Sequence, residues 1–198
     1  LRADMAKPGL ITWDFTRMRL GEVSNPTLGP LVGRTVAEIA AERGAHPVDT
    51  FLDLALEDRL EARFNMPFVN TDDALCAELF TDPRTLVSLS DGGAHADMLC
   101  DAGFATYLLG YWVRERQAIG LEAAVRKLTG DQADFYGLHD RGRIRTGLAA
   151  DLVVFDPARV GSPLTPEAVN DFPAGCRRYI TRPTGIHKVV VAGDVVVE

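Results

Sequence analysis

The pattern of apolar residues changes near residue 138, and this change most constrains the fold. Before it, short apolar runs alternate with segments in which apolar residues recur every three or four positions. After it, apolar runs such as 150–156 and 189–197 are short and bounded by Gly or Pro. Alternating strands and helices predict a parallel sheet with crossover helices, whereas the tail predicts a separate β unit. We therefore expect an α/β fold with two domains, residues 1–137 and 138–198.

Local signals predict two helices in the first part of the chain. The run Thr35-Val36-Ala37-Glu38 is a capping box, so a helix is expected from there to about Arg43, ending at Gly44. Pro47 suits the first turn of a second helix. Its apolar residues form one stripe at helical spacing, made of Val48, Phe51, Leu52, Ala55 and Leu56.

Further elements follow from the same reasoning. A strand is expected over Thr85–Leu89 and an aromatic-rich helix over 104–116. The stretch 157–184 is rich in Pro and Gly and is expected to be irregular. The run 189–197 predicts a hairpin that turns at Gly193-Asp194.

Composition excludes some classes of protein. The chain has 198 residues and a formal net charge of −7, which argues against nucleic acid or an anionic membrane as the main partner. No apolar run approaches the roughly 18–20 residues that span a bilayer, and the N-terminus has no signal-peptide pattern. The three cysteines are odd in number and widely spaced, so a disulfide framework is not expected. We expect a cytoplasmic location.

The length bears on the architecture of the alternating part. A closed (β/α)8 barrel typically needs about 250 residues. The chain is shorter than that, so either its sheet is open or its barrel is incomplete. It also begins without Met and enters a strand-like run almost at once, which favours a fragment, although a processed terminus would look the same.

The strongest candidate for chemistry is Asp91, which follows the predicted strand 85–89. Sites in α/β folds are built at the C-terminal ends of parallel strands. An acid there can bind a metal, take a proton from water, or simply cap the next helix. Gly92 and Gly93 leave room for a ligand near the backbone, and His95 is either a substrate contact or a loop histidine bonded to backbone.

A complete metal site cannot be assembled from this sequence. Asp97, Cys100 and Asp101 lie close to Asp91, but the four histidines are scattered and none forms a pair at ligand spacing. A catalytic zinc usually has three protein ligands and one open position. The sequence nominates one good ligand, Asp91.

Two other groups of residues are interpreted as structural and not as functional. The aromatic residues of the 104–116 helix, including Tyr107 and Tyr111, are expected to form its packed face. The pair Arg177-Arg178 is interpreted as part of a solvated surface.

Several motifs together resemble the amidohydrolase superfamily. They are Ser88–His95, Leu108–Glu115, Gly147–Asp156 and Val191–Val196, in this order along the chain. Within the superfamily the sequence is similar to the N-acyl-D-amino-acid deacylase (D-aminoacylase) branch. The early His-x-His pair and later histidine ligands of the family have no counterpart in these 198 residues.

The resemblance implies a metal-dependent hydrolase, of which this chain is the C-terminal part of a (β/α)8 barrel plus a small β-sandwich segment. Asp91 then corresponds to the acid that ends the eighth strand, a ligand of a divalent metal, expected to be zinc, and the general base toward the attacking water. Gly92, Gly93 and His95 are expected to bind the substrate. The remaining metal ligands are expected outside this chain.

The resemblance also implies the reaction, which is hydrolysis of the C–N bond of a small-molecule amide, an N-acyl-D-amino acid. Two alternatives stay open: a cyclic-amide hydrolase, and a non-catalytic interaction module in which Asp91 is structural. The segment alone is expected to be inactive. Because its barrel surface would be uncovered, it is also expected to associate into oligomers.

Overall fold

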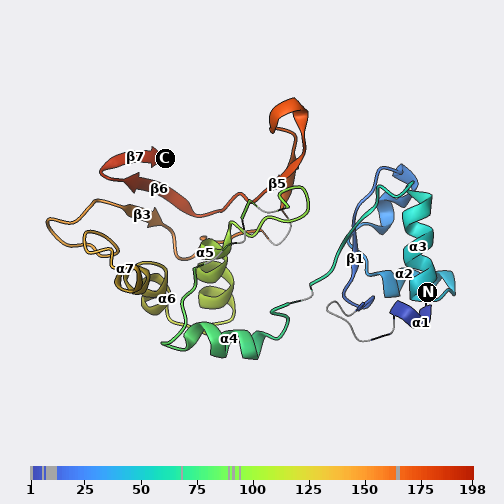
Figure 1. Ribbon diagram of the computed structural model, residues 1–198, viewed down its shortest axis with the longest axis horizontal. Helices are drawn as coiled ribbons and strands as arrows, with labels where there is room; N and C mark the ends of the chain where they lie inside the picture. Colours follow the sequence, from blue (N-terminus) through green and yellow to red (C-terminus); the bar gives the residue numbers. More distant parts are fainter. Residues whose placement is uncertain are drawn as a thin grey trace. The chain divides into compact units, whose positions relative to one another are not determined.

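The computed structural model describes residues 2–5, 7, 13–67, 69–88, 90, 92–93, 95–163 and 166–198. The chain divides into two compact units, Leu1–Asp73 and Ala74–Glu198 (Figure 1). The boundary between domains that the sequence predicts, near residue 137, stays a prediction.

The first unit packs helices beside a two-stranded antiparallel sheet, in which Leu20 lies opposite Phe64. Its core consists of Leu20, Leu28, Ile39 and Leu54. The elements in chain order are α1 (Arg2–Met5), β1 (Arg19–Glu22), the 3-10 helix η1 (Pro26–Leu31), α2 (Val36–Arg43), α3 (Pro47–Glu57) and β2 (Arg63–Asn65).

The capping box of α2 forms as the sequence predicts. The backbone N–H of Glu38 donates to Thr35 Oγ1 at 3.1 Å, and the backbone N–H of Thr35 donates to Glu38 Oε2 at 2.7 Å. This second bond lowers the pKa of the Glu38 carboxyl. The helix ends at Gly44, whose φ of 63° is left-handed, so both predicted ends are confirmed.

The apolar stripe predicted for α3 is wrong in part. The buried residues are Val48, Thr50 and Leu54, whereas Leu56 is 66% exposed. Phe51 turns toward the sheet, where its ring meets the edge of Phe64 at 4.7 Å between centroids. The core thus lies against the face centred on Thr50 and Leu54, which the spacing of apolar residues alone does not identify.

The second unit combines helices with two antiparallel sheets. Its largest core cluster is made of Leu108, Leu109, Ala124 and Val160. The elements are α4 (Asp73–Thr81), α5 (Phe104–Tyr107), the π-helix η2 (Leu108–Glu115), α6 (Leu121–Leu128), α7 (Gly130–Tyr136), β3 (Leu152–Phe155), β4 (Glu167–Val169), the 3-10 turn η3 (Pro173–Gly175), β5 (Arg178–Ile180), β6 (Ile186–Val191) and β7 (Asp194–Val197).

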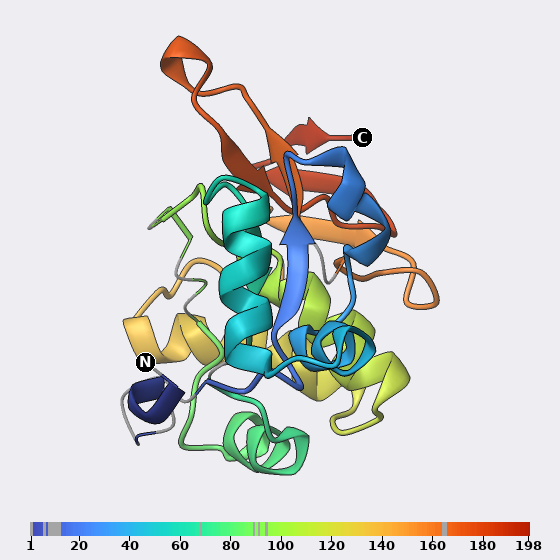
Figure 2. The same cartoon turned by 90° about the vertical axis from the view of Figure 1, so that its right-hand side faces the viewer.

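The β-rich tail predicted after residue 138 is present, with two corrections. The hairpin of β6 and β7 turns at Ala192 and Gly193, whose φ values of 51° and 93° are both left-handed, not at Gly193-Asp194. The stretch 157–184 is not irregular throughout, because β4 and β5 form an antiparallel hairpin within it. Figure 2 shows this hairpin, in orange, projecting from the three-stranded sheet β3-β6-β7.

The predicted strand 85–89 does not form over its described residues 85–88. Two of its carbonyl groups, and one just before it, accept hydrogen bonds from side chains of α6 and α7 instead. Lys127 Nζ donates to Asp82 O at 2.9 Å and to Thr85 O at 3.0 Å, and Gln132 Nε2 donates to Val87 O at 2.8 Å. These donors hold the segment that leads toward residue 91.

The strand pairs found in the described part of the chain are all antiparallel. The mixed α/β composition agrees with the predicted class, while the parallel barrel sheet stays a prediction. No helix among the described residues has the length and apolar character needed to cross a membrane.

Gly185 sits where the chain returns to the sheet beside Val160, and we predict that replacing it with Ala destabilises the protein strongly. A Cβ there would lie 2.5 Å from the carbonyl carbon of Arg159, at a φ of +70°. Left-handed strain of about 1–2 kcal/mol and overpacking of about 1–3 kcal/mol should together lower the free energy of unfolding. Urea denaturation measures this change.

Gly193→Ala is the matched control, because Gly193 also has a positive φ but has no atom within 4 Å of a built Cβ. We expect it to cost only the strain, about 1–2 kcal/mol. Equal losses for the two variants would contradict the close packing at Gly185.

We also predict that Lys127→Met lowers the free energy of unfolding by about 1–3 kcal/mol, because two carbonyl groups lose their donor. Lys127 is only 6% exposed, and Met preserves most of its apolar stem. The control is Lys188→Met, which removes an exposed ion pair to Glu198 and should change stability by about 0.5 kcal/mol or less. Chemical denaturation of the two variants gives the comparison. An unchanged free energy of unfolding for Lys127→Met would contradict a stabilising role for these two hydrogen bonds.

Candidate functional site

Asp91, the residue predicted to be catalytic and to bind metal, lies outside the described residues. The other three predicted site residues, Gly92, Gly93 and His95, are described. The site can therefore be followed on the C-terminal side of the acid, from Gly92 to the start of α5.

Gly92, Gly93 and His95 each have the backbone geometry of a turn. The backbone N–H of Gly92 donates to Ser90 Oγ at 3.1 Å. Gly93 has a φ of +97°, which only glycine adopts readily, and a Cβ built there would meet nothing within 4 Å. The backbone at Gly93 is thus open, as close approach of a ligand requires.

His95 also has a left-handed φ, of 50°, and its carbonyl oxygen accepts from the N–H of Met98 at 2.7 Å and of Leu99 at 3.1 Å. These bonds involve the backbone, and the residue as a whole is exposed. The imidazole is therefore accessible to a ligand.

The loop after His95 is held by a segment about 80 residues further along the chain. The backbone N–H of Tyr179, in β5, donates to Ala96 O at 2.7 Å. Two residues later, Thr181 Oγ1 donates to Cys100 O at 3.1 Å. Strand β5 therefore runs beside the loop that carries the predicted substrate-binding residues (Figure 1).

A second set of contacts fixes the end of the same loop. Ser162 Oγ donates to Gly103 O at 2.9 Å and lies 2.5 Å from Thr106 Oγ1. A Cβ at Gly103 would lie 2.5 Å from Ser162 Oγ and 2.7 Å from Thr181 Cγ2. Glycine is therefore needed at 103 for the loop to approach the C-terminal segment this closely.

The structure differs from the sequence interpretation at Arg177. Its guanidinium carbon lies 4.9 Å from the centre of the Tyr179 ring, and its Nη2 donates to the Tyr179 hydroxyl at 2.9 Å. Tyr179 is only 7% exposed, and Arg177 is half-buried. This arginine thus packs on a tyrosine whose backbone is bonded to Ala96, and no local sequence signal distinguishes it from its neighbour.

Arg178 fits the sequence interpretation of a solvated surface. Its Nε donates to Asp171 Oδ1 at 2.6 Å, and this hydrogen bond lowers the pKa of the Asp171 carboxyl. Arg182 makes a similar pair with Glu167 at 2.7 Å. Both pairs lie within the β4–β5 hairpin region and are exposed, so they contribute little to stability.

The described residues do not gather three or more His, Cys, Asp or Glu side chains in a group able to hold a metal ion. Asp97, Cys100 and Asp101 therefore do not form a metal site with one another. The three cysteines, Cys76, Cys100 and Cys176, are free thiols.

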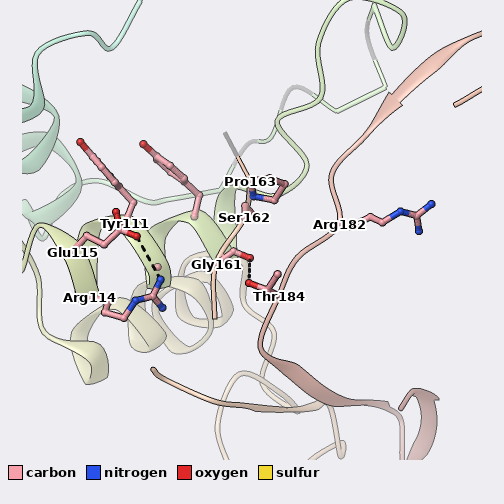
Figure 3. Close-up of a pocket in the computed structure, with 10 residues that line it drawn as sticks. Tyr111, Arg114, Glu115, Gly161, Ser162, Pro163, Arg182 and Thr184 are labelled. Atoms are coloured by element: carbon pink, nitrogen blue, oxygen red, sulfur yellow. Dashed lines mark hydrogen bonds and ion pairs between the residues drawn. The ribbon is translucent and has the colours of Figure 1, made fainter. Parts of the chain in front are cut away.

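A separate hollow of about 390 Å³ lies between η2 and the segments 161–163 and 182–184 (Figure 3). The rings of Tyr107 and Tyr111 stack along one side of it, 5.0 Å apart between centroids. Arg182 points away from the Tyr111 ring. None of Gly92, Gly93 or His95 lines this hollow, so it is distinct from the predicted site.

Comparison with known proteins identifies relatives over most of the chain. The model of the amidohydrolase family matches residues 14–197. The D-aminoacylase of Alcaligenes xylosoxydans xylosoxydans is 33% identical over 165 residues, which are 82% of this chain and 30% of that protein. The N-acyl-D-aspartate deacylase of the same organism is 35% identical over 162 residues, 80% of this chain and 28% of that protein.

The chain is also similar to a protein of known structure. The N-acyl-D-glutamate deacylase from Bordetella bronchiseptica, crystallised with zinc and a phosphonate inhibitor, is 28% identical, with a TM-score of 0.48 over 91% of this chain and 34% of that one.

The chain spans between 26% and 30% of the length of the curated relatives that it matches. The family model, in contrast, covers nearly all of the chain, including the Gly92–His95 turn and the β-rich tail. The chain belongs to the amidohydrolase family.

Proposed function

We propose that this chain is the C-terminal portion of a metal-dependent amidohydrolase that hydrolyses the amide C–N bond of N-acyl-D-amino acids. The observation that carries the proposal is the family match over residues 14–197, together with 33–35% identity to two deacylases of such substrates. The turn after Asp91 supports it, because Gly93 is open and His95 is accessible.

The proposed architecture has barrel units in residues 1–137 and a β-sandwich segment in 138–198. The three-stranded sheet supports the second part. Apolar side chains are exposed on both of its faces, because neighbouring residues of a strand point to opposite sides, so the sheet has apolar surface that another layer can cover. They are Val153, Val154, Val191, Val195, Val196 and Val197. In isolation, such surfaces favour association into oligomers.

Within this proposal Asp91 has two roles, as a metal ligand and as the general base. Asp91 would be one ligand of a divalent metal, which we propose to be zinc and which, when bound, would supply an activated water by lowering its pKa to about 7. The Asp91 carboxylate accepts the proton from the attacking water and transfers it to the leaving amine. Gly92, Gly93 and His95 are proposed to bind the substrate, since they follow the acid directly.

The described residues do not by themselves fit a metal centre, because they bring no three ligand side chains together. The proposed centre therefore needs ligands besides Asp91 from outside the described part of this chain. No step of the reaction beyond the proton transfers of Asp91 is assigned to these residues.

Asp91→Asn in the full-length, zinc-loaded protein tests the role of the acid. We expect kcat to fall about 10²- to 10⁴-fold with little change in the melting temperature, because the amide cannot accept the proton. Steady-state assays with N-acyl-D-amino acids give the rate, and thermal unfolding gives the stability. Retained activity together with lost stability would instead favour the alternative of a non-catalytic module with a structural Asp91.

Residues 1–198 alone are predicted to have no substantial hydrolase activity, even with added zinc, because the metal ligands are incomplete. The full-length protein under the same conditions is the positive control. Metal-dependent release of D-amino acids by the isolated segment would refute the prediction. Release of ring-opened product from cyclic amides, but not of D-amino acids, by the full-length protein would favour the cyclic-amide alternative.

A further inference from the structure

We propose that Thr181 is a positioning residue of the hydrolase, whose side chain holds the loop 95–103 in the conformation that binds the substrate. The inference rests on the proposed function, in which Gly92, Gly93 and His95 contact the substrate. It follows from the places where the hydroxyl and the methyl group of Thr181 meet this loop.

The hydrogen bonds inside the loop are local. The N–H groups of Met98 and Leu99 donate to His95 O, at 2.7 and 3.1 Å. Such bonds close a turn, but they join residues of the loop only and do not fix its direction relative to the rest of the unit. His95 and Met98 are exposed, so their side chains do not anchor the loop in a core. Its position therefore depends on contacts with other segments.

The hydroxyl group of Thr181 makes such a contact in the middle of the loop. Thr181 directly follows β5, whose Tyr179 donates its backbone N–H to Ala96 O at 2.7 Å. The Thr181 hydroxyl donates to Cys100 O at 3.1 Å and lies 3.4 Å from Cys100 Sγ. The loop is thus attached to this segment at both Ala96 and Cys100, and His95 directly precedes the first of these points.

The methyl group of Thr181 meets the end of the same loop. A Cβ built at Gly103 would lie 2.7 Å from Thr181 Cγ2, so the backbone of Gly103 packs directly on this methyl group. Because threonine is branched at Cβ and has few rotamers, the directions of its hydroxyl and methyl groups are set together. The half-buried side chain therefore gives the loop one polar and one apolar contact from a single rigid group.

The other contacts with the loop cannot be removed as selectively. The bond at Ala96 comes from a backbone N–H, which a side-chain substitution leaves in place. Ser162 Oγ donates to Gly103 O but also bonds to Thr106 Oγ1 of α5, so its loss would disturb a helix as well. Thr181 is therefore the residue at which the loop can be released with the least change elsewhere.

Release of the loop should weaken substrate binding more than it slows the saturated enzyme. Without the tether, a fraction of the molecules has the loop out of position, and the apparent affinity falls in proportion to the competent fraction. A bound substrate contacts the turn and selects the competent conformation, so the rate is recovered at saturation. A defect in the chemical step would instead lower kcat.

The test uses Thr181→Val in the full-length, zinc-loaded protein, because valine keeps the shape of threonine and removes the hydroxyl group. We expect KM for N-acetyl-D-amino acids to rise about 3- to 10-fold, the factor typical of one neutral hydrogen bond, with kcat changed less than about 2-fold. Thr181→Ser restores the hydroxyl group and should bring KM back to within about 2-fold of the wild-type value.

Thr184→Val is the matched control. Its Oγ1 donates to Arg159 O at 3.0 Å, a bond of the same kind that does not involve the loop. This variant should leave KM unchanged even where it lowers the melting temperature. Thermal unfolding verifies that each variant is folded, and if Thr181→Val is not, Thr181→Ala replaces it with the same expected rise in KM.

Hydrogen exchange of the substrate-free protein tests the position of the loop independently of activity. The backbone amides of Met98 and Leu99 should exchange about 3- to 10-fold faster in Thr181→Val than in the wild-type protein, because the loop opens more often. Their exchange should be unchanged in Thr184→Val.

Two outcomes separate the proposal from the function on which it rests. Suppose that the wild-type protein hydrolyses N-acyl-D-amino acids. If Thr181→Val then leaves KM or the exchange unchanged, or if Thr184→Val raises KM equally, the assignment of Thr181 is wrong while the amidohydrolase function stands. If the wild-type protein hydrolyses none of these substrates, the proposed function itself fails, and the assignment of Thr181 fails with it.

Discussion

The second unit depends on the close approach of two backbones at Gly110 and Gly161. A Cβ at Gly110 would lie 2.9 Å from both Gly161 Cα and Val160 O, so glycine is needed for the π-helix η2 to contact this segment directly. Arg114, one turn along the helix, donates to the carbonyl groups of Val160 and Pro157. The helix is thus fixed to the segment that follows β3, with Val160 fully buried between them.

This contact sets the position of the loop that precedes the helix. Gly103 lies where the loop meets α5. The hydroxyl of Ser162, next to Gly161, donates a hydrogen bond to the carbonyl group of Gly103. From there the loop extends back to His95 along β5, bonded at Cys100 and Ala96. The geometry on the C-terminal side of Asp91 is therefore determined in part by residues 160–181. If Asp91 acts as we propose, the C-terminal segment supports the site as well as completing the fold.

Features governed by neighbouring residues were predictable from sequence. The capping box at Thr35 and the left-handed Gly44 define α2 as expected, because both depend on atoms within one helical turn. Gly137 likewise ends α7 in a left-handed conformation, with a φ of 69°. Features governed by distant partners were not. The hairpin of β4 and β5 lies in a stretch rich in Pro and Gly, and in the segment expected to be a strand the carbonyl groups of Thr85 and Val87 accept from Lys127 and Gln132.

In the candidate site, too, residues that share a local motif were predictable from sequence, whereas a contact made through distant residues was not. Asp91, Gly92, Gly93 and His95 were nominated from one continuous motif, whose glycines and acid are recognisable together. Arg177 was interpreted as a surface residue, since it is one of two adjacent arginines and nothing local separates them. What separates them is that β5 directs Arg178 to Asp171, whereas Arg177 lies on the ring of Tyr179, itself bonded to the loop. A side-chain position that depends on a partner distant in the sequence has no signature in its own neighbourhood, so only the folded chain distinguishes it.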